Sequence, residues 1–141
     1  MKQTISFVTL GVSDLDRSRQ FYKTLGWQES SGSQENVAFF QVGNIAFALF
    51  GRESLADDAT VSPVGSGFPG FSLAHNVASE LEVDATLQEA VAAGGSLIRA
   101  GAKASWGGFR GYFADPDGFL WEVCFNPFFP LNKDGFVQLP K

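Results

Sequence analysis

The sequence predicts an α+β fold made of two tandem βαβββ modules, and three observations lead to this prediction. Short runs of alternating apolar residues, typical of strands, surround two segments with the apolar spacing of helices. The same order of elements occurs twice, at a period of roughly 65 residues. A segment rich in glycine and proline, residues 51–70, separates the two copies. We expect one domain over 1–141, with module 1 at about 4–50, a linker at 51–70, module 2 at about 71–127 and a tail at 128–141.

The first module begins with a strand and a helix. Residues 5–12 alternate, which places one set of side chains on each face of a strand. Val8, Leu10 and Val12 share one face, and Phe7, Thr9 and Gly11 share the other. Ser13 and Asp14 are typical helix caps, and Gly26 is typical of a helix end. The rest of the module predicts a short strand at 27–31, a turn, and strands at 37–42 and 45–50 joined by Gly43 and Asn44.

The second module repeats this order. Ser79 and Glu82 have the spacing of a capping box, and the helix that follows ends at two glycines. The turn at 115–118, Asp-Pro-Asp-Gly, joins the last two strands. We expect strands at 71–77, 97–99, 109–114 and 119–126. Each module leaves one sheet face without a helix. Together the modules therefore predict a curved, eight-stranded mixed sheet around a cavity, with the helices on the outside.

Charge and composition exclude several partners. The 141 residues carry a formal net charge of −5, and the ten Lys and Arg form no run. Nucleic acids and anionic membranes both require a basic surface, so neither is an expected partner. The single cysteine, Cys124, excludes an intrachain disulfide and a cluster of cysteine ligands. With no signal-type or membrane-spanning stretch, we expect a cytoplasmic protein.

Two motifs, one in each module, carry a resemblance to a known family. The first is Val-Ser-Asp-Leu-Asp-Arg-Ser at 12–18, followed by Phe-Tyr-Lys-Thr-Leu-Gly at 21–26. The second is Asp-Pro-Asp-Gly-Phe-Leu-Trp-Glu-Val at 115–123. In this order, the motifs resemble the vicinal oxygen chelate superfamily over about residues 4–127. That superfamily includes glyoxalase I, extradiol dioxygenases, fosfomycin-resistance enzymes and bleomycin-binding proteins.

The resemblance also implies where a metal would bind. In the family's enzymes, four side chains, usually His and Glu, hold a divalent metal that acts as a Lewis acid. Carried over one at a time, these positions fall on Phe7, Ala48, Ser72 and Glu122, with Phe71 as the alternative to Ser72. Only Glu122 matches the family's ligand types. Because a metal site normally needs three or more protein ligands, we expect neither a metal nor another cofactor.

Two functions follow from the resemblance. The first is a binding protein of the sequestration or resistance type, which holds a small hydrophobic or aromatic molecule in a metal-free cavity. Its expected ligand-binding residues are Phe7, Thr9, Ala48, Ser72, Trp106, Arg110 and Glu122. The alternative is a metal-independent or atypical lyase or isomerase that uses Glu122 as acid/base. The resemblance further implies a homodimer.

Three sites each allow two interpretations, and a fourth allows one. Glu122 is either a desolvated acid/base or a carboxylate hydrogen-bonded to a neighbour such as a tyrosine. Residues 106–112 form either a lip in which Trp106 stacks on a flat ligand and Arg110 binds its anion, or a glycine turn with Arg110 in solvent. His75 is either a general base or a residue packed between strand and helix. Cys124 is interpreted as a small core residue.

Overall fold

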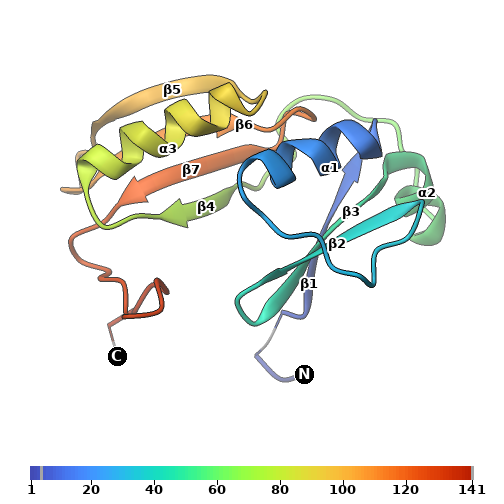
Figure 1. Cartoon of the computed structure of the whole chain (residues 1–141), viewed down its shortest axis with the longest axis horizontal. Helices are drawn as coiled ribbons and strands as arrows, with labels where there is room; N and C mark the ends of the chain where they lie inside the picture. The colour runs from blue at the N-terminus through green and yellow to red at the C-terminus, as the bar shows by residue number, and fades with distance from the viewer. Residues whose placement is uncertain (4, 141) are drawn as a thin grey trace. The chain divides into compact units, whose positions relative to one another are not determined.

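The computed structural model describes residues 1–3 and 5–140, and the chain divides into two compact units, residues 1–67 and 68–141. Each unit combines one sheet with helices (Figure 1). The α+β class is therefore confirmed. None of the helices formed by the described residues is long and apolar enough to cross a membrane.

Unit 1 contains a three-stranded sheet and two helices. Its elements are β1 (Phe7–Val12), α1 (Leu15–Thr24), β2 (Val37–Val42), β3 (Ile45–Gly51) and α2 (Arg52–Asp58). The strand order is β1-β3-β2, with β1 parallel and β2 antiparallel to β3. The strands expected at 5–12, 37–42 and 45–50 are thus present within one or two residues of their expected bounds.

Helix α1 begins and ends where the sequence predicts. The Asp14 side chain accepts a hydrogen bond of 3.0 Å from the backbone N–H of Arg17, and Gly26 follows the helix with φ +87°. Glycine suits that left-handed conformation because it has no Cβ. The helix buries Tyr22 completely against the sheet. The centroids of the Trp27 and Phe47 rings each lie 5.0 Å from that of Tyr22, so an aromatic cluster forms the core of this unit.

The short strand expected at 27–31 is not formed, and the expectation of an eight-stranded sheet was wrong. The described residues contain seven strands in two sheets of three and four. One isolated bridge, Glu29 to Phe40, remains at that place. A turn begins directly after it, where Ser33 N–H donates to the Ser30 carbonyl at 3.0 Å. Glu29 is held by Arg19 at 3.0 Å, which fixes the segment without a ladder of backbone hydrogen bonds.

The segment 51–70, expected to be a linker, begins with helix α2. Gly51 precedes the helix without a side-chain cap, and Ala56 is buried. The helix packs on β1, where a Cβ added to Gly11 would lie 3.3 Å from Arg52 Cα and from a methyl group of Leu55. The four glycines and two prolines of the segment obscured a short helix whose stability comes from this packing.

Unit 2 has the βαβββ order that the sequence predicts. Its elements are β4 (Leu73–Asn76), α3 (Glu80–Ala92), β5 (Ser96–Lys103), β6 (Phe109–Ala114) and β7 (Leu120–Phe125). The strand order is β4-β7-β6-β5, with β4 parallel to β7 and the other pairs antiparallel. Helix α3 runs across one face of this sheet (Figure 1).

The predicted capping box starts α3. Ser79 Oγ accepts from Glu82 N–H at 3.2 Å, and the Glu82 carboxylate accepts from the Ala78 N–H at 3.1 Å. The helix then buries Leu87 against β6, where Gly111 allows a close approach. A Cβ on Gly111 would lie 2.5 Å from a Leu87 methyl group and 2.8 Å from the Arg99 carbonyl. Helix α3 therefore covers the sheet face on which Gly111 lies.

Candidate functional site

Four polar or ionisable side chains of the two central strands, β6 and β7, share the sheet face opposite α3. In the pairing of β6 with β7, Tyr112 lies opposite Glu122 and Arg110 lies opposite Cys124. Residues directly opposite one another, and residues two apart on a strand, point to the same face. On the same basis Ala74 of β4, which pairs with Glu122, belongs to this face. We call the surface formed by Arg110, Tyr112, Glu122 and Cys124 the Glu122 face.

The side chains of the Glu122 face act on one another electrostatically. Burial raises the pKa of Tyr112, and the charge of Glu122 and a side-chain hydrogen bond to it raise that pKa further, while Arg110 opposes the shift. Burial also raises the pKa of the Cys124 thiol, with Glu122 adding to the shift and Arg110 again opposing it. Tyr112 is thus the kind of tyrosine neighbour that one interpretation of Glu122 anticipated. The cationic neighbour of Cys124 is Arg110, which lies opposite it on the adjacent strand.

Arg110 and Glu122 leave hydrogen-bonding capacity unused. Arg110 is only partly exposed, and its Nη1 is buried without a hydrogen-bond partner. Among the described residues, no ion pair joins Arg110 to a carboxylate, and the hydrogen bond from Tyr112 occupies only part of the accepting capacity of the Glu122 carboxylate. Native proteins rarely leave buried polar groups in this condition, so the face is a candidate binding site.

The segment 106–112 is a glycine turn that enters β6, and Trp106 lies against it. Ala104 N–H donates to the Gly108 carbonyl at 2.8 Å, and Gly107 has φ +100°. A Cβ on Gly108 would collide with the Trp106 ring, so the ring lies over this residue. Gly108 precedes Arg110 by two positions, so the indole lies close in sequence to the Glu122 face. Trp106 is 43% exposed. Arg110 is not simply solvated, since its Nη1 is buried.

Phe7, Thr9 and Ala48, the predicted site residues of unit 1, lie on one sheet face of that unit. Thr9 pairs with Ala48 between β1 and β3, and Phe7 lies two residues before Thr9. Phe7 is 56% exposed, whereas Ala48 is buried. A hollow of about 240 Å³ on this unit is lined by Phe7, Ser30, Phe39, Phe40, Gln41 and Ala46. Of the three predicted residues, Phe7 alone lines this hollow.

Ser72 directly precedes β4 and His75 lies within it. The two residues belong to opposite sides of the sheet. Ser72 is exposed and precedes the strand. Two residues later, Ala74 pairs with Glu122, so Ser72 is in register with the Glu122 face. His75 pairs with Val123 and points to the side of α3. Partial burial lowers the pKa of His75 and the charge of Glu89 on α3 raises it. His75 therefore lies on the sheet face away from Glu122, although its side chain is exposed and not enclosed between strand and helix.

The donor atoms of the four expected metal positions do not fit the family's metal. Phe7 and Ala48 offer no donor atom, and Ser72 offers a neutral hydroxyl. Glu122 is the one carboxylate of the set. Across the part of the chain that the structure describes, no three His, Cys, Asp or Glu side chains gather closely enough to hold a metal ion. Asp115 instead closes its own turn, accepting from the N–H groups of Asp117 at 3.0 Å and Phe119 at 2.9 Å.

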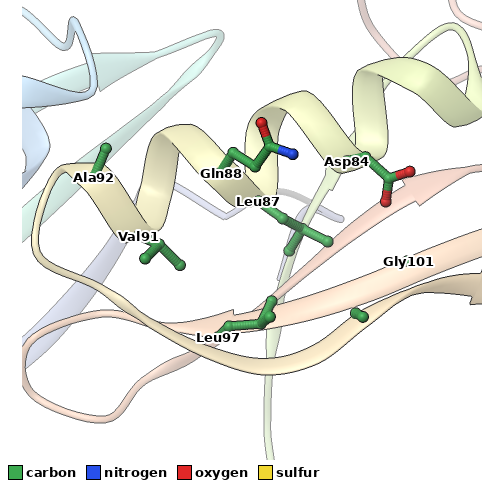
Figure 2. Close-up of a pocket in the computed structure, with 8 residues that line it drawn as sticks. Asp84, Leu87, Gln88, Val91, Ala92, Leu97 and Gly101 are labelled. Carbon is green, nitrogen blue, oxygen red and sulfur yellow. The ribbon is translucent and has the colours of Figure 1, made fainter.

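A groove on the other side of unit 2 was not predicted. It lies between α3 and β5, and its volume is about 470 Å³. Leu87 and Val91 extend from the helix toward Leu97 on the strand, and Asp84 lies at one end (Figure 2). The small residues Ala100 and Gly101 also line the groove, and the Asp84 carboxylate and the Phe109 ring lie against Gly101. The groove contains none of the predicted site residues.

Comparisons with known proteins complete the description. Residues 4–123 match the family described as Glyoxalase/Bleomycin resistance protein/Dioxygenase superfamily. A glyoxalase-related enzyme from Fulvimarina pelagi is 38% identical, with 99% of each chain covered and a TM-score of 0.89. A comparison with curated proteins gives no significant match.

Two further structures share the fold at lower identity. A glyoxalase/bleomycin resistance protein/dioxygenase family enzyme from Burkholderia phytofirmans PsJN is 23% identical, covering 85% of this chain and 96% of its own, with a TM-score of 0.74. Lactoylglutathione lyase from Agrobacterium tumefaciens is 21% identical, covering 89% and 96%, with a TM-score of 0.67. At these identities the likeness concerns the fold alone.

Proposed function

This chain belongs to the Glyoxalase/Bleomycin resistance protein/Dioxygenase superfamily, and from this premise we propose that it binds a small, planar hydrophobic molecule on the Glu122 face. The observation that carries the proposal is the position of Trp106, whose partly exposed ring lies over Gly108, two residues before Arg110. An indole held in this way offers a flat apolar surface for stacking. The absence of a fitting metal donor set favours binding that depends on the chain's own side chains.

A titration with a neutral planar probe tests the proposal. We expect 2-naphthol to shift the backbone amide NMR signals of Gly108, Arg110 and Glu122 saturably. Trp106→Ala should weaken binding about three- to tenfold, the size of an aromatic stacking contribution. Leu97→Ala, a matched truncation in the α3–β5 groove, should leave the affinity unchanged. Saturable shifts confined to that groove, or no saturable shifts at all, would refute the proposal.

A second candidate function is a metal-independent lyase or isomerase with Glu122 as acid/base. The observation that favours it is the coupling of Glu122 to the Tyr112 phenol, because adjacent groups that share a proton suit proton transfer. The test is deuterium uptake from solvent into carbonyl compounds. Uptake should be lost in Glu122→Gln and kept in Glu29→Gln, a carboxylate of unit 1 bound to Arg19. Equal uptake by both variants would eliminate Glu122 as the base.

The homodimer that the resemblance implies is a separate proposal. Light scattering coupled to size-exclusion chromatography should give twice the chain's mass at micromolar concentration. A single species with the mass of one chain would refute it.

A further inference from the structure

We infer that the ligand of the Glu122 face carries both an oxyanion, bound by Arg110, and a separate hydrogen-bond donor, bound by Glu122. A hydroxy-substituted aromatic carboxylate is the chemical class that combines these groups with a planar body. The inference rests on the proposed function and specifies which planar molecules the face selects.

The oxyanion follows from the condition of Arg110. Its Nη1 is buried and has no hydrogen-bond partner. A buried donor without an acceptor is costly, and a guanidinium matches the planar geometry of a carboxylate. A ligand carboxylate that reaches Nη1 supplies the missing acceptor. The chain's net charge of −5 opposes any general attraction of anions, so selective binding of an anion requires a specific cation.

The donor follows from the condition of Glu122. A carboxylate has about four acceptor positions, and the structure uses few of them here. Tyr112 donates a side-chain hydrogen bond to Glu122, which leaves other acceptor positions of the carboxylate open to a ligand. A hydroxyl of the ligand, donating to Glu122, would occupy one of these positions.

The two requirements belong to one ligand because Arg110 and Glu122 do not pair with each other. They lie diagonally on neighbouring strands of the same face, because Arg110 is two residues before the partner of Glu122. Diagonal neighbours are about 7 Å apart, a span that one aromatic ring with two substituents can bridge. A ligand with only an anionic group would be repelled by the Glu122 carboxylate. A ligand with only a hydrogen-bond donor would leave Arg110 without an acceptor.

A series of naphthalene derivatives separates these contributions. The probes are 6-hydroxy-2-naphthoate, which carries both groups, and 2-naphthoate, 2-naphthol and 6-methoxy-2-naphthoate, each of which lacks one. We expect 6-hydroxy-2-naphthoate to bind about tenfold or more tightly than each of the others, as charged hydrogen bonds require. Their affinities are measured by NMR titration at one pH and salt concentration.

Variants assign each contribution to its residue. Arg110→Gln should reduce the affinity for 6-hydroxy-2-naphthoate to about that for 2-naphthol. Glu122→Gln should remove the preference for hydroxy over methoxy. Lys103→Gln, an equal loss of charge on an exposed residue that pairs with Phe109, should change nothing. Arg110→Lys keeps the charge and serves if Arg110→Gln does not fold. It should retain the preference for 6-hydroxy-2-naphthoate over 2-naphthol, but with weaker binding.

The outcomes distinguish this inference from the proposed function. If all four probes bind equally and Trp106→Ala weakens them all, the face binds planar molecules but the inference is wrong. If Lys103→Gln weakens the anionic probes as much as Arg110→Gln, the effect is one of overall charge, which also overturns it. If no probe binds, the proposed function itself fails.

Discussion

Tyr112 lies directly opposite Glu122 in the antiparallel pairing of β6 and β7. The carboxylate raises the pKa of the phenol beyond the rise that burial causes, and Arg110 lowers it. Two charges of opposite sign therefore act on one titrating group, and removing either one moves its pKa in a known direction. This relationship yields the first two predictions.

Glu122→Gln should lower the pKa of Tyr112, and Arg110→Gln should raise it. Burial should keep the pKa above 10.0 in both variants because it is the largest cause of the shift. NMR of tyrosine ring carbons measures the titration, with the fully buried Tyr22 as internal reference. A shift in the same direction in both variants would show that these charges do not control the phenol.

The same shift predicts a pH dependence of folding. The pKa of Tyr112 is raised in the folded state, so its contribution to stability is complete below the unfolded value near 10 and is lost as pH rises through the folded pKa. Urea unfolding as a function of pH should show a decline in the free energy of unfolding above about pH 10. Glu122→Gln should make that decline smaller. Tyr112→Phe removes the titrating phenol and should therefore remove the part of the decline that Tyr112 causes.

The Cys124 thiol should react slowly with a disulfide reagent at pH 8 in the folded protein. Burial and the Glu122 charge raise its pKa above 9.0, which reduces the reactive thiolate. The chain has one cysteine, so the reaction reports on this residue alone. Glu122→Gln should accelerate the reaction and Arg110→Gln should slow it. Equal rates in native and unfolded protein would contradict the prediction.

Gly111→Ala should destabilise the protein by about 1–3 kcal/mol. The new methyl group would lie 2.5 Å from Leu87 and 2.8 Å from the Arg99 carbonyl, so helix or strand must shift. Gly65→Ala is the matched control, because its nearest neighbour, Arg52 Nη2, is 3.8 Å away. The control should leave stability unchanged or raise it slightly. Equal losses in both variants, measured by urea unfolding, would contradict the close packing of α3 on β6.

Added zinc, nickel or manganese should not raise the melting temperature. A metal that binds only the folded state stabilises it by RT ln(1 + c/Kd), where c is the metal concentration, so a concentration well above Kd would raise the melting temperature visibly. The positions carried over from the family offer one carboxylate, on Glu122, and two side chains without donor atoms. A metal-dependent rise that Glu122→Gln removes would show that another donor set completes a site around this residue.

Much of the fold was predictable because its signals are local. The Asp14 and Ser79 caps, the glycine after α1 and the Asp115 turn depend on a few consecutive residues and their backbone angles. The alternation of residues 7–12 correctly separated Phe7 and Thr9 from the buried Leu10 and Val12. The strand expected near Glu29 is not formed, because contacts of Glu29 with the distant residues Phe40 and Arg19 determine the structure there. Helix α2 was not predicted, because it depends on packing against Gly11.

The sequence by itself determined the chain's family, the order of elements in unit 2 and the mismatch at the expected metal positions, because residue identity and local spacing suffice for these. Only the tertiary structure decided that Tyr112 and Arg110 are the neighbours of Glu122 and Cys124. Strand register sets such neighbours, and register depends on packing between residues distant in sequence. The unpaired state of Arg110, on which the ligand's class depends, is a property of that packing.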